Sequence, residues 1–337
     1  MKKSKSKHRG NYIDAFVKKM FGRVLVFADF LTNYADPRFV AEVNLKKIKP
    51  APTHYIGKDG DERIIDLVFQ CPLKNGLGDM MAVIIFEHQN RSLKEIPRKL
   101  HKYISAIWDA EAKEGKKTLS APYFIVLRTG KKPHRGSLPK MQDSLPKGRD
   151  GTPVGKVVEI EYDVVDLPAW DFNKLLGGPV LRLAMGILKS MAESNGEKLP
   201  EALLPLLEIS DEGQKIELTT ELLVFVAKAF AAQNRHFDKK MISQTLHPIL
   251  KGKEIFMIPT IFEEVEARGE ARGEARGIAI GEARGKVLTI LETRFKKVPK
   301  RVENTIRQMN DTIALNSWAE HAATCQSMGE FEKALGK

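Results

Sequence analysis

The sequence is poor in cysteine and has no long uncharged apolar run. Cys71 and Cys325 are the only cysteines among 337 residues, which is too few for a disulfide framework or a zinc site and is typical of a reducing cytoplasm. No stretch reaches the roughly 18 to 20 apolar residues that span a bilayer, and the basic start MKKSKSKHRG has no apolar segment behind it to form a secretory signal. These absences predict a cytoplasmic protein without a membrane anchor.

Several familiar catalytic patterns are missing as well. The glycines form neither a Walker loop nor a dinucleotide-binding fingerprint. The histidines have no metal-ligand spacing, and no Ser/His/Asp or Cys/His arrangement can be argued.

Positive charge is what the chain has in excess. The formal net charge is +12 and the pI is near 9.5, which favours polyanionic partners because lysine and arginine release counterions when they contact phosphates. A basic protein with no nucleic-acid partner is the alternative. Nucleic acid is the partner that this charge favours.

The order of predicted elements is typical of an α/β domain followed by helices. A helix is expected over residues 11–30, two strands over 63–70 and 80–89, a helix over 92–112, and strands over 122–128 and 157–167. The fold class is therefore α/β, a mixed sheet flanked by helices, followed by an all-α C-terminal region. The expected divisions are a disordered basic arm (1–10), an α/β sheet domain (11–170), a helical region (171–260), a repeat segment that is a helix or a linker (261–286) and a C-terminal helical segment (287–337).

Residues 266–285 read EARGEARGEARGIAIGEARG. On a helix, a four-residue repeat places glutamates, arginines and glycines in three slowly winding rows. Like charges four residues apart repel, and glycine costs up to about 1 kcal/mol per residue relative to alanine. A second copy could offset both defects, so we expect a homo-oligomer through this segment. A flexible charged linker is the alternative.

The strand MMAVIIFEHQNR, residues 80–91, carries polar residues inside an apolar run. Glu87 and Gln89 are two apart and share one face of a strand. A turn centred between Gly76 and Leu77 would put Asp66 opposite Glu87, with Cβ atoms roughly 4.5 to 5.5 Å apart. Two such carboxylates are suited to Mg²⁺, which prefers oxygen ligands. The alternative is a salt bridge from either acid to Arg63, Arg91 or Arg128.

These segments carry a resemblance to a known family. RIIDLVF, VIIFEHQNRS, RKLHKYISAIW, IVLRTGKKP and YDVVDL resemble the Rpn family of recombination-promoting nucleases (YhgA-like transposases) of the PD-(D/E)XK superfamily, over about residues 8 to 170. The resemblance implies a restriction-endonuclease-like fold. It further implies that Asp66 and Glu87 hold Mg²⁺ or Mn²⁺, that Gln89 replaces the superfamily lysine, and that Asp14 is the acidic residue of the first helix.

The implied activity is metal-dependent hydrolysis of DNA phosphodiesters by an endonuclease linked to recombination and mobile elements. Lys94, Lys99 and Lys102 follow the predicted site and could hold flanking phosphates. Gln89 carries no positive charge, so the alternative is a catalytically weak or inactive DNA-binding or assembly protein that retains the nuclease fold.

Overall fold

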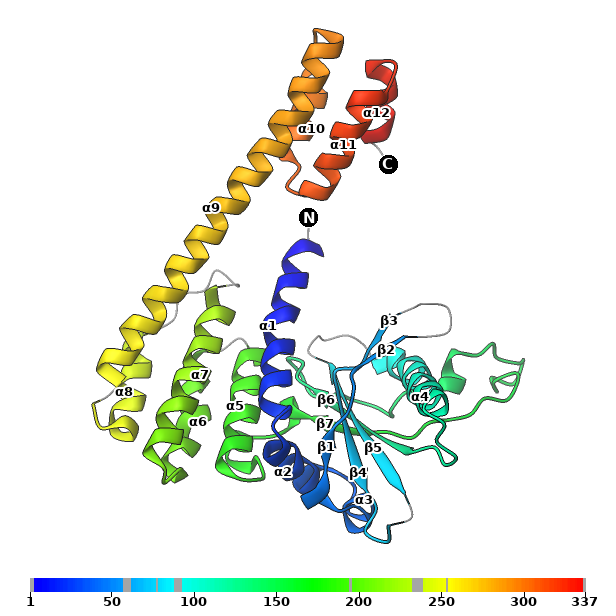
Figure 1. Cartoon of the computed structure of the whole chain (residues 1–337), viewed down its shortest axis with the longest axis vertical. Helices are drawn as coiled ribbons and strands as arrows, with labels where there is room; N and C mark the ends of the chain where they lie inside the picture. The colour runs from blue at the N-terminus through cyan, green and yellow to red at the C-terminus, as the bar shows by residue number, and fades with distance from the viewer. Residues whose placement is uncertain are drawn as a thin grey trace. The chain divides into compact units, whose positions relative to one another are not determined.

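The computed structural model describes residues 3–56, 62–76, 78–87, 93–193, 196–231, 239–252 and 254–335. The chain forms two compact units, residues 1–262 and 263–337 (Figure 1). Within the described ranges, no helix combines the length and the apolar character that crossing a membrane requires.

The first unit combines one five-stranded sheet, a small two-stranded sheet and helices. Its helices are α1 (Lys3–Phe21), α2 (Val24–Tyr34), α3 (Pro37–Glu42), α4 (Ile96–Lys113), α5 (Pro179–Glu193), α6 (Leu199–Leu203), α7 (Glu212–Ala231) and α8 (Lys239–Leu250). Its strands are β1 (Lys49–Pro50), β2 (His54–Ile56), β3 (Glu62–Ile64), β4 (Leu67–Pro72), β5 (Asp79–Glu87), β6 (Ala121–Arg128) and β7 (Asp163–Asp166).

The main sheet is mixed, in the order β1-β4-β5-β6-β7. Strands β4 and β5 form the predicted antiparallel hairpin, whereas β5, β6 and β7 are parallel. A parallel pair needs a crossover connection, and α4 provides it between β5 and β6. The fold class expected from the sequence is confirmed.

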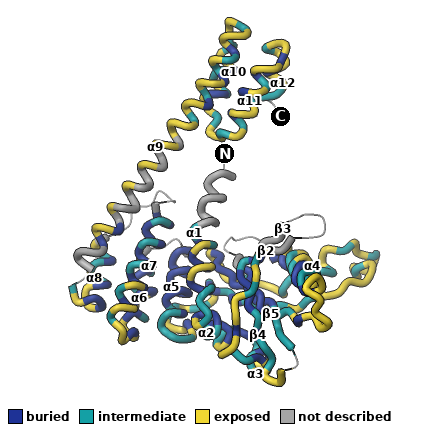
Figure 2. The backbone as a smooth tube through the Cα atoms, in the orientation of Figure 1, coloured by how far each residue is buried: buried dark blue, intermediate teal, exposed yellow. Residues whose placement is uncertain are grey.

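Helices cover both faces of the sheet. Alternate residues of β5, including Val83 and Ile85, pack in one core with Leu100 of α4. On the other face, Phe27 of α2 stacks on Phe69 of β4 with ring centroids 3.7 Å apart. Burial on both faces explains why these strands read as nearly continuous apolar runs, and Figure 2 shows the central strands as mostly buried.

The predicted first helix is divided into two. Helix α1 ends at Phe21 and α2 begins at Val24, because the chain turns tightly at Gly22, where an added Cβ would lie 2.3 Å from the Lys18 carbonyl oxygen. Helix α1 also begins at Lys3, where the sequence predicted a disordered arm over residues 1–10.

The last predicted strand is shorter than expected. Strand β7 begins only at Asp163, opposite Ile125. The residues before β7 bind the preceding loop and do not extend the strand. The Glu159 carboxylate accepts hydrogen bonds from the Met141 and Gln142 amides, at 2.8 Å each. This use of the chain takes residues 157–162 out of the sheet.

The helices that follow the sheet pack closely on one another. Gly186 of α5 lies against α6, where an added Cβ would be 3.1 Å from the Ala202 Cβ. Phe16 of α1 stacks on Phe225 of α7 with centroids 4.1 Å apart. The all-helical character predicted for this part is confirmed.

The second unit is a small helical bundle with its own core. Helix α9 (Glu254–Phe295) runs through the whole EARG repeat and enters this unit, which also contains α10 (Lys300–Gln308), α11 (Thr312–Thr324) and α12 (Met328–Leu335). Val287 and Leu291 of α9 pack with residues of the other three helices, among them Ile306, Leu315 and Phe331. The repeat is therefore helical in this structure.

Candidate active site

The predicted acidic residues lie at one edge of the main sheet. Strand β4 begins at Leu67, whose Cα pairs with that of Ile84 near the end of β5. Asp66, directly before β4, and Glu87, the last residue of β5, are therefore at the same edge. This edge is formed by the carboxyl ends of the three parallel strands, which we call the carboxyl edge. In open α/β sheets, ligands bind outside the carboxyl ends of the strands.

Asp66 lies in a β-bulge. Between the Pro50–Phe69 pair and the His54–Ile64 pair, the chain covers four residues on the first side (50 to 54) and five on the second (64 to 69). The second side therefore holds one extra residue. Hydrogen bonds from the Ala51 amide to the Val68 carbonyl (2.9 Å) and from the Ile65 amide to the Thr53 carbonyl (2.8 Å) confine the extra residue to Asp66–Leu67. Bulges re-aim side chains and are common next to active sites.

The hairpin register differs from the predicted one by two residues. Because Leu67 is opposite Ile84, Asp66 follows on opposite Ile85 and not opposite Glu87, so the predicted direct opposition is wrong. The cause is the turn, in which the Leu73 amide donates to the Gly78 carbonyl at 2.9 Å. The centre of the turn therefore lies one residue earlier in the chain than predicted. A shift of two residues preserves the alternation of faces, which makes Asp66 and Glu87 diagonal neighbours in backbone register.

Glu87 is the first of three charged residues in a row across the parallel strands. Its Cα pairs with that of Arg128 at the end of β6, and Arg128 pairs with Asp166 at the end of β7. The side chain of Glu87 lies outside the described residues, as do all atoms of Gln89. Their direct convergence with Asp66, which is itself half-buried, stays a prediction.

Arg128, which is buried, and Asp166, which is half-buried, form an ion pair that the sequence did not predict. Arg128 Nη1 donates to Asp166 Oδ1 and, at 2.8 Å, to the Lys132 carbonyl. The second oxygen of Asp166 accepts the His134 amide at 2.5 Å. Asp166 therefore fixes both the guanidinium and the start of the following loop. The available signal was that IVLR and VVD both end in a charged residue after a buried strand.

This ion pair bears on the alternative that an arginine forms a salt bridge with Asp66 or Glu87. Arg128 was one of three arginines that could have neutralised Asp66 or Glu87, and its recorded partner is Asp166. The side chains of the other two, Arg63 and Arg91, lie outside the described residues.

The loop between β6 and β7 carries an exposed basic surface. Two segments of it are tied together, since the Tyr162 hydroxyl donates to the Pro139 carbonyl at 3.0 Å and the Gly148 amide donates to the Thr152 carbonyl at 2.8 Å. We call the following exposed cations the loop cations: Lys131, Lys132, Arg135, Lys140, Lys147, Arg149 and Lys156.

The other predicted residues lie on two helical segments. Lys94 is in a 3-10 turn (Leu93–Glu95), and Lys99 and Lys102 are in α4, the helix that follows β5 in the chain. Lys94 and Lys102 are exposed and Lys99 is half-buried. Asp14 is on α1, which packs against α2 and α7. A metal-binding role for Asp14 and phosphate-binding roles for these lysines stay predictions.

Metal-binding clusters of three or more His, Cys, Asp or Glu side chains are absent from the described part of the chain, which leaves out Glu87. A site held by two carboxylates, water and a substrate phosphate is nevertheless suited to Mg²⁺. The residue types at the carboxyl edge therefore fit that ion.

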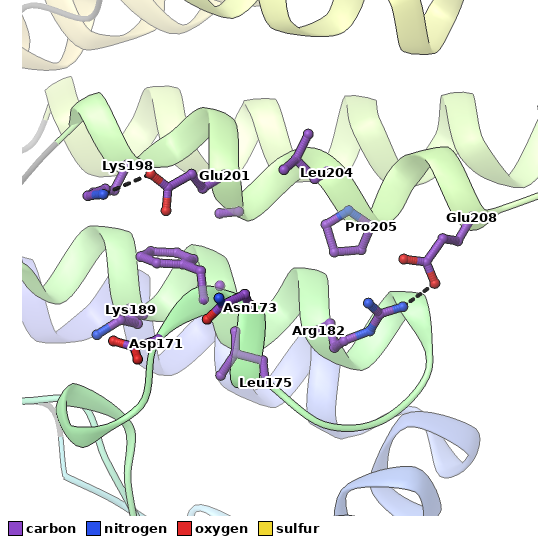
Figure 3. A pocket seen from close by; sticks show the side chains of 13 residues that line it. Asp171, Asn173, Leu175, Arg182, Lys189, Lys198, Glu201, Leu204, Pro205 and Glu208 are labelled. Atoms are coloured by element: carbon purple, nitrogen blue, oxygen red, sulfur yellow. Dashed lines mark hydrogen bonds and ion pairs between the residues drawn. The ribbon is translucent and has the colours of Figure 1, made fainter.

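A large cavity lies elsewhere, among α5, α6 and the segments beside them (Figure 3). Its volume is about 690 Å³. Its charged residues largely pair with each other: Arg182 with Glu208, and Lys198 with Glu201 at 2.8 Å. None of the predicted site residues lines it. The candidate site is therefore the carboxyl edge, where the interruption at Asp66 and the charged row from Glu87 to Asp166 lie.

Comparisons with curated proteins and with solved structures give no match. Residues 11–217 match the family described as "Putative transposase, YhgA-like". The match covers more than half of the 337 residues and includes the whole sheet, the bulge at Asp66 and the row from Glu87 to Asp166. The chain therefore belongs to the YhgA-like putative transposase family, whose description points to the movement of DNA elements.

Proposed function

We propose that this chain is a Mg²⁺-dependent DNA endonuclease that hydrolyses phosphodiester bonds, acting in DNA recombination or in the movement of DNA elements. The observation that carries the proposal is the placement of Asp66, in a bulge, and Glu87, at the end of the neighbouring strand, on one edge of the sheet. Family membership supports the link to recombination.

Asp66 and Glu87 would hold the metal ion, with Asp14 as a further acidic candidate and Mn²⁺ as an alternative ion. When bound, such an ion neutralises charge on the phosphate and makes a water molecule more acidic. Gln89 has no charge, but its amide can accept and donate hydrogen bonds. Its role would be to orient the attacking water.

DNA would be held by charge along the edge. The loop cations lie in the loop that follows β6, and Lys94, Lys99 and Lys102 lie in the helical segments that follow β5. Contacts of this kind position a duplex through its phosphates without reading its bases. Binding should therefore weaken steeply as salt concentration rises.

A plasmid-nicking assay tests the proposal. Wild type should nick supercoiled DNA with Mg²⁺ or Mn²⁺, whereas Asp66→Ala and Glu87→Ala should not. Arg38→Ala is a control, because the Arg38 side chain is 89% exposed and pairs with Asp36, directly before α3. Equal nicking by all four proteins would indicate a contaminant and end the proposal.

A DNA-binding or assembly protein without catalytic activity is the second candidate, favoured by the neutral side chain of Gln89. It predicts that wild type binds DNA and leaves it intact under all metal conditions. Fluorescence anisotropy with labelled DNA, run beside the nicking assay, separates the two.

We further propose self-association through residues 266–285. Helix α9 is continuous across them, and an added Cβ at Gly277, Gly281 or Gly285 would meet nothing within 4 Å, which leaves room for a second helix. Sedimentation velocity of the full chain over a range of concentrations tests this, and a monomer at all concentrations would contradict it.

A further inference from the structure

Arg128 is a buried cation at the carboxyl edge. Only 6% of its surface is exposed, and a charge in such a place is costly unless it is paired. Asp166, with 16% of its side chain exposed, supplies the opposite charge. The pair explains how the guanidinium is tolerated, but a pair of this kind is not in itself evidence of stabilisation.

The guanidinium retains donor capacity. An arginine has five N–H groups in a rigid planar fork. Both hydrogen bonds recorded for Arg128 are made by Nη1. The three N–H groups of Nε and Nη2 therefore have no acceptor among the side chains and backbone groups that the structure describes. Asp166 thus orients the guanidinium and leaves the N–H groups of Nε and Nη2 able to donate to a ligand.

The position of Arg128 matches a chemical need of the proposed site. Its Cα is paired with that of Glu87 on the adjacent parallel strand, and neighbouring strands are about 4.8 Å apart. Gln89 offers no positive charge to the phosphate. An electrophile close to Glu87 would supply it, and Arg128 is the cation at that place in the register.

We infer that Arg128, oriented by Asp166, is a catalytic residue that donates hydrogen bonds to the scissile phosphate and stabilises the charge that develops there. This inference rests on the proposed nuclease function and names the group that does the work of the missing lysine. An arginine suits the task because its fork matches two phosphate oxygens at once.

The hydrolytic step is balanced without proton transfer by Arg128. The oxygen of a water molecule forms a bond to phosphorus while the bond from phosphorus to the leaving sugar oxygen breaks. One proton leaves the attacking water and one reaches the leaving oxygen, both through solvent. Arg128 remains protonated throughout and contributes hydrogen bonds and charge only.

The test compares Arg128→Ala with Arg38→Ala, since both remove an arginine that pairs with an aspartate. Nicking turnover at saturating DNA should fall about 100-fold in Arg128→Ala, as expected when one transition-state donor is lost, and stay at the wild-type level in Arg38→Ala. Added guanidinium ion should restore part of the turnover of Arg128→Ala. DNA affinity without divalent ions, measured by anisotropy, should change less than about threefold, because one phosphate contact is a small share of binding.

A second variant covers the outcome in which Arg128→Ala does not fold. The double variant Arg128→Met/Asp166→Leu removes both charges and leaves neither buried alone, and such replacements are often neutral for stability. Once its thermal unfolding matches that of wild type, its turnover at saturating DNA should also be about 100-fold lower.

The results distinguish this inference from the proposed function. Turnover that survives in the folded Arg128 variants but is lost in Asp66→Ala overturns the role of Arg128 and keeps the nuclease. Weaker DNA affinity with unchanged turnover and no guanidinium rescue would reduce Arg128 to an anchor of the loop and overturn the inference. No metal-dependent nicking by wild type would overturn both.

Discussion

The two edges of the main sheet both carry charged and polar side chains, but they use them differently. At the edge opposite the carboxyl edge, which we call the amino edge, the groups satisfy one another. Glu111 at the end of α4 accepts from the Ser120 amide (2.8 Å), the Ser120 hydroxyl (2.6 Å) and Lys116 Nζ (2.9 Å). These three contacts connect the end of α4 to the residues before β6.

Tyr123 makes a second closed network at the amino edge. Its hydroxyl accepts the Asp36 amide at 2.6 Å and donates to Asp163 Oδ2, and its ring stacks on Phe39 with centroids 3.9 Å apart. Burial, followed by the hydrogen bond to Asp163, raises the pKa of Tyr123. The tyrosine therefore stays a neutral donor.

The carboxyl edge has a different design. A bulge interrupts the strand at Asp66, and Asp166 uses both oxygens to hold Arg128 and the start of a basic loop. The comparison shows that charged residues at the amino edge saturate one another, whereas at the carboxyl edge the strand is interrupted and Arg128 retains hydrogen-bond donors. Changes at the two edges should therefore have separable effects.

The largest expected effect is at the carboxyl edge, on withdrawal of divalent ions. Chelation with EDTA should lower plasmid nicking by about 10³-fold or more, since a metal supplies several kcal/mol of transition-state stabilisation. Excess Mg²⁺ should restore it. The amino-edge variant Glu111→Gln should respond in the same way, and nicking that persists in EDTA would remove the distinction between the edges.

Asp166→Ala should give the largest loss of stability. It leaves Arg128 buried without its partner and frees the His134 amide, and removing one member of a buried pair costs about 3–5 kcal/mol. The free energy of unfolding from urea titrations measures the loss. A cost below about 1 kcal/mol, typical of an exposed pair, would mean that this edge is more open to water than the buried arginine indicates.

Glu111→Gln should lower stability by a smaller amount, about 1.5–3 kcal/mol for a hydrogen bond to a charged group, with turnover unchanged. Burial opposes ionisation of Glu111, but the Ser120 and Lys116 hydrogen bonds outweigh it and lower its pKa from the usual 4.5. A lowered pKa adds stability above the pKa of the unfolded chain, and this stability is lost as the pH falls through the folded value. The difference between wild type and variant should thus be full near pH 7 and vanish well below pH 4.5, whereas a constant difference would contradict the ionised state.

Tyr123→Phe should have the smallest effect. It keeps the stack on Phe39 and removes only the hydroxyl between Asp36 and Asp163, which costs about 1 kcal/mol. Thermal unfolding should show a small fall in Tm with no change in turnover or DNA affinity. A loss of nicking in this variant would show that the amino edge takes part in catalysis.

Local patterns predicted most of the elements. The apolar periods indicated α4 and the hairpin strands because side-chain spacing follows helix and strand geometry. They did not predict the break at Gly22, which depends on a close approach to the Lys18 carbonyl. The extent of β7 was also missed, because pairing with β6 decides where that strand begins.

The candidate site also combines residues that local patterns predicted with contacts that only the tertiary structure shows. Asp66 and Glu87 were identified from acids inside apolar runs, but their register was wrong by two residues because the turn between the strands sets it. The Arg128–Asp166 pair joins residues 38 apart in sequence. No local pattern predicts a contact at that separation.

The sequence by itself determined the α/β character of the first part, the helical character of the second, the basic charge and the family. Composition, short-range periodicity and local motifs depend only on the order of residues along the chain. The tertiary structure alone decided which charged side chains meet. Strand order, the bulge at Asp66 and the parallel pairing of β5, β6 and β7 bring distant residues to one edge, since hydrogen bonding between strands acts across the chain and not along it.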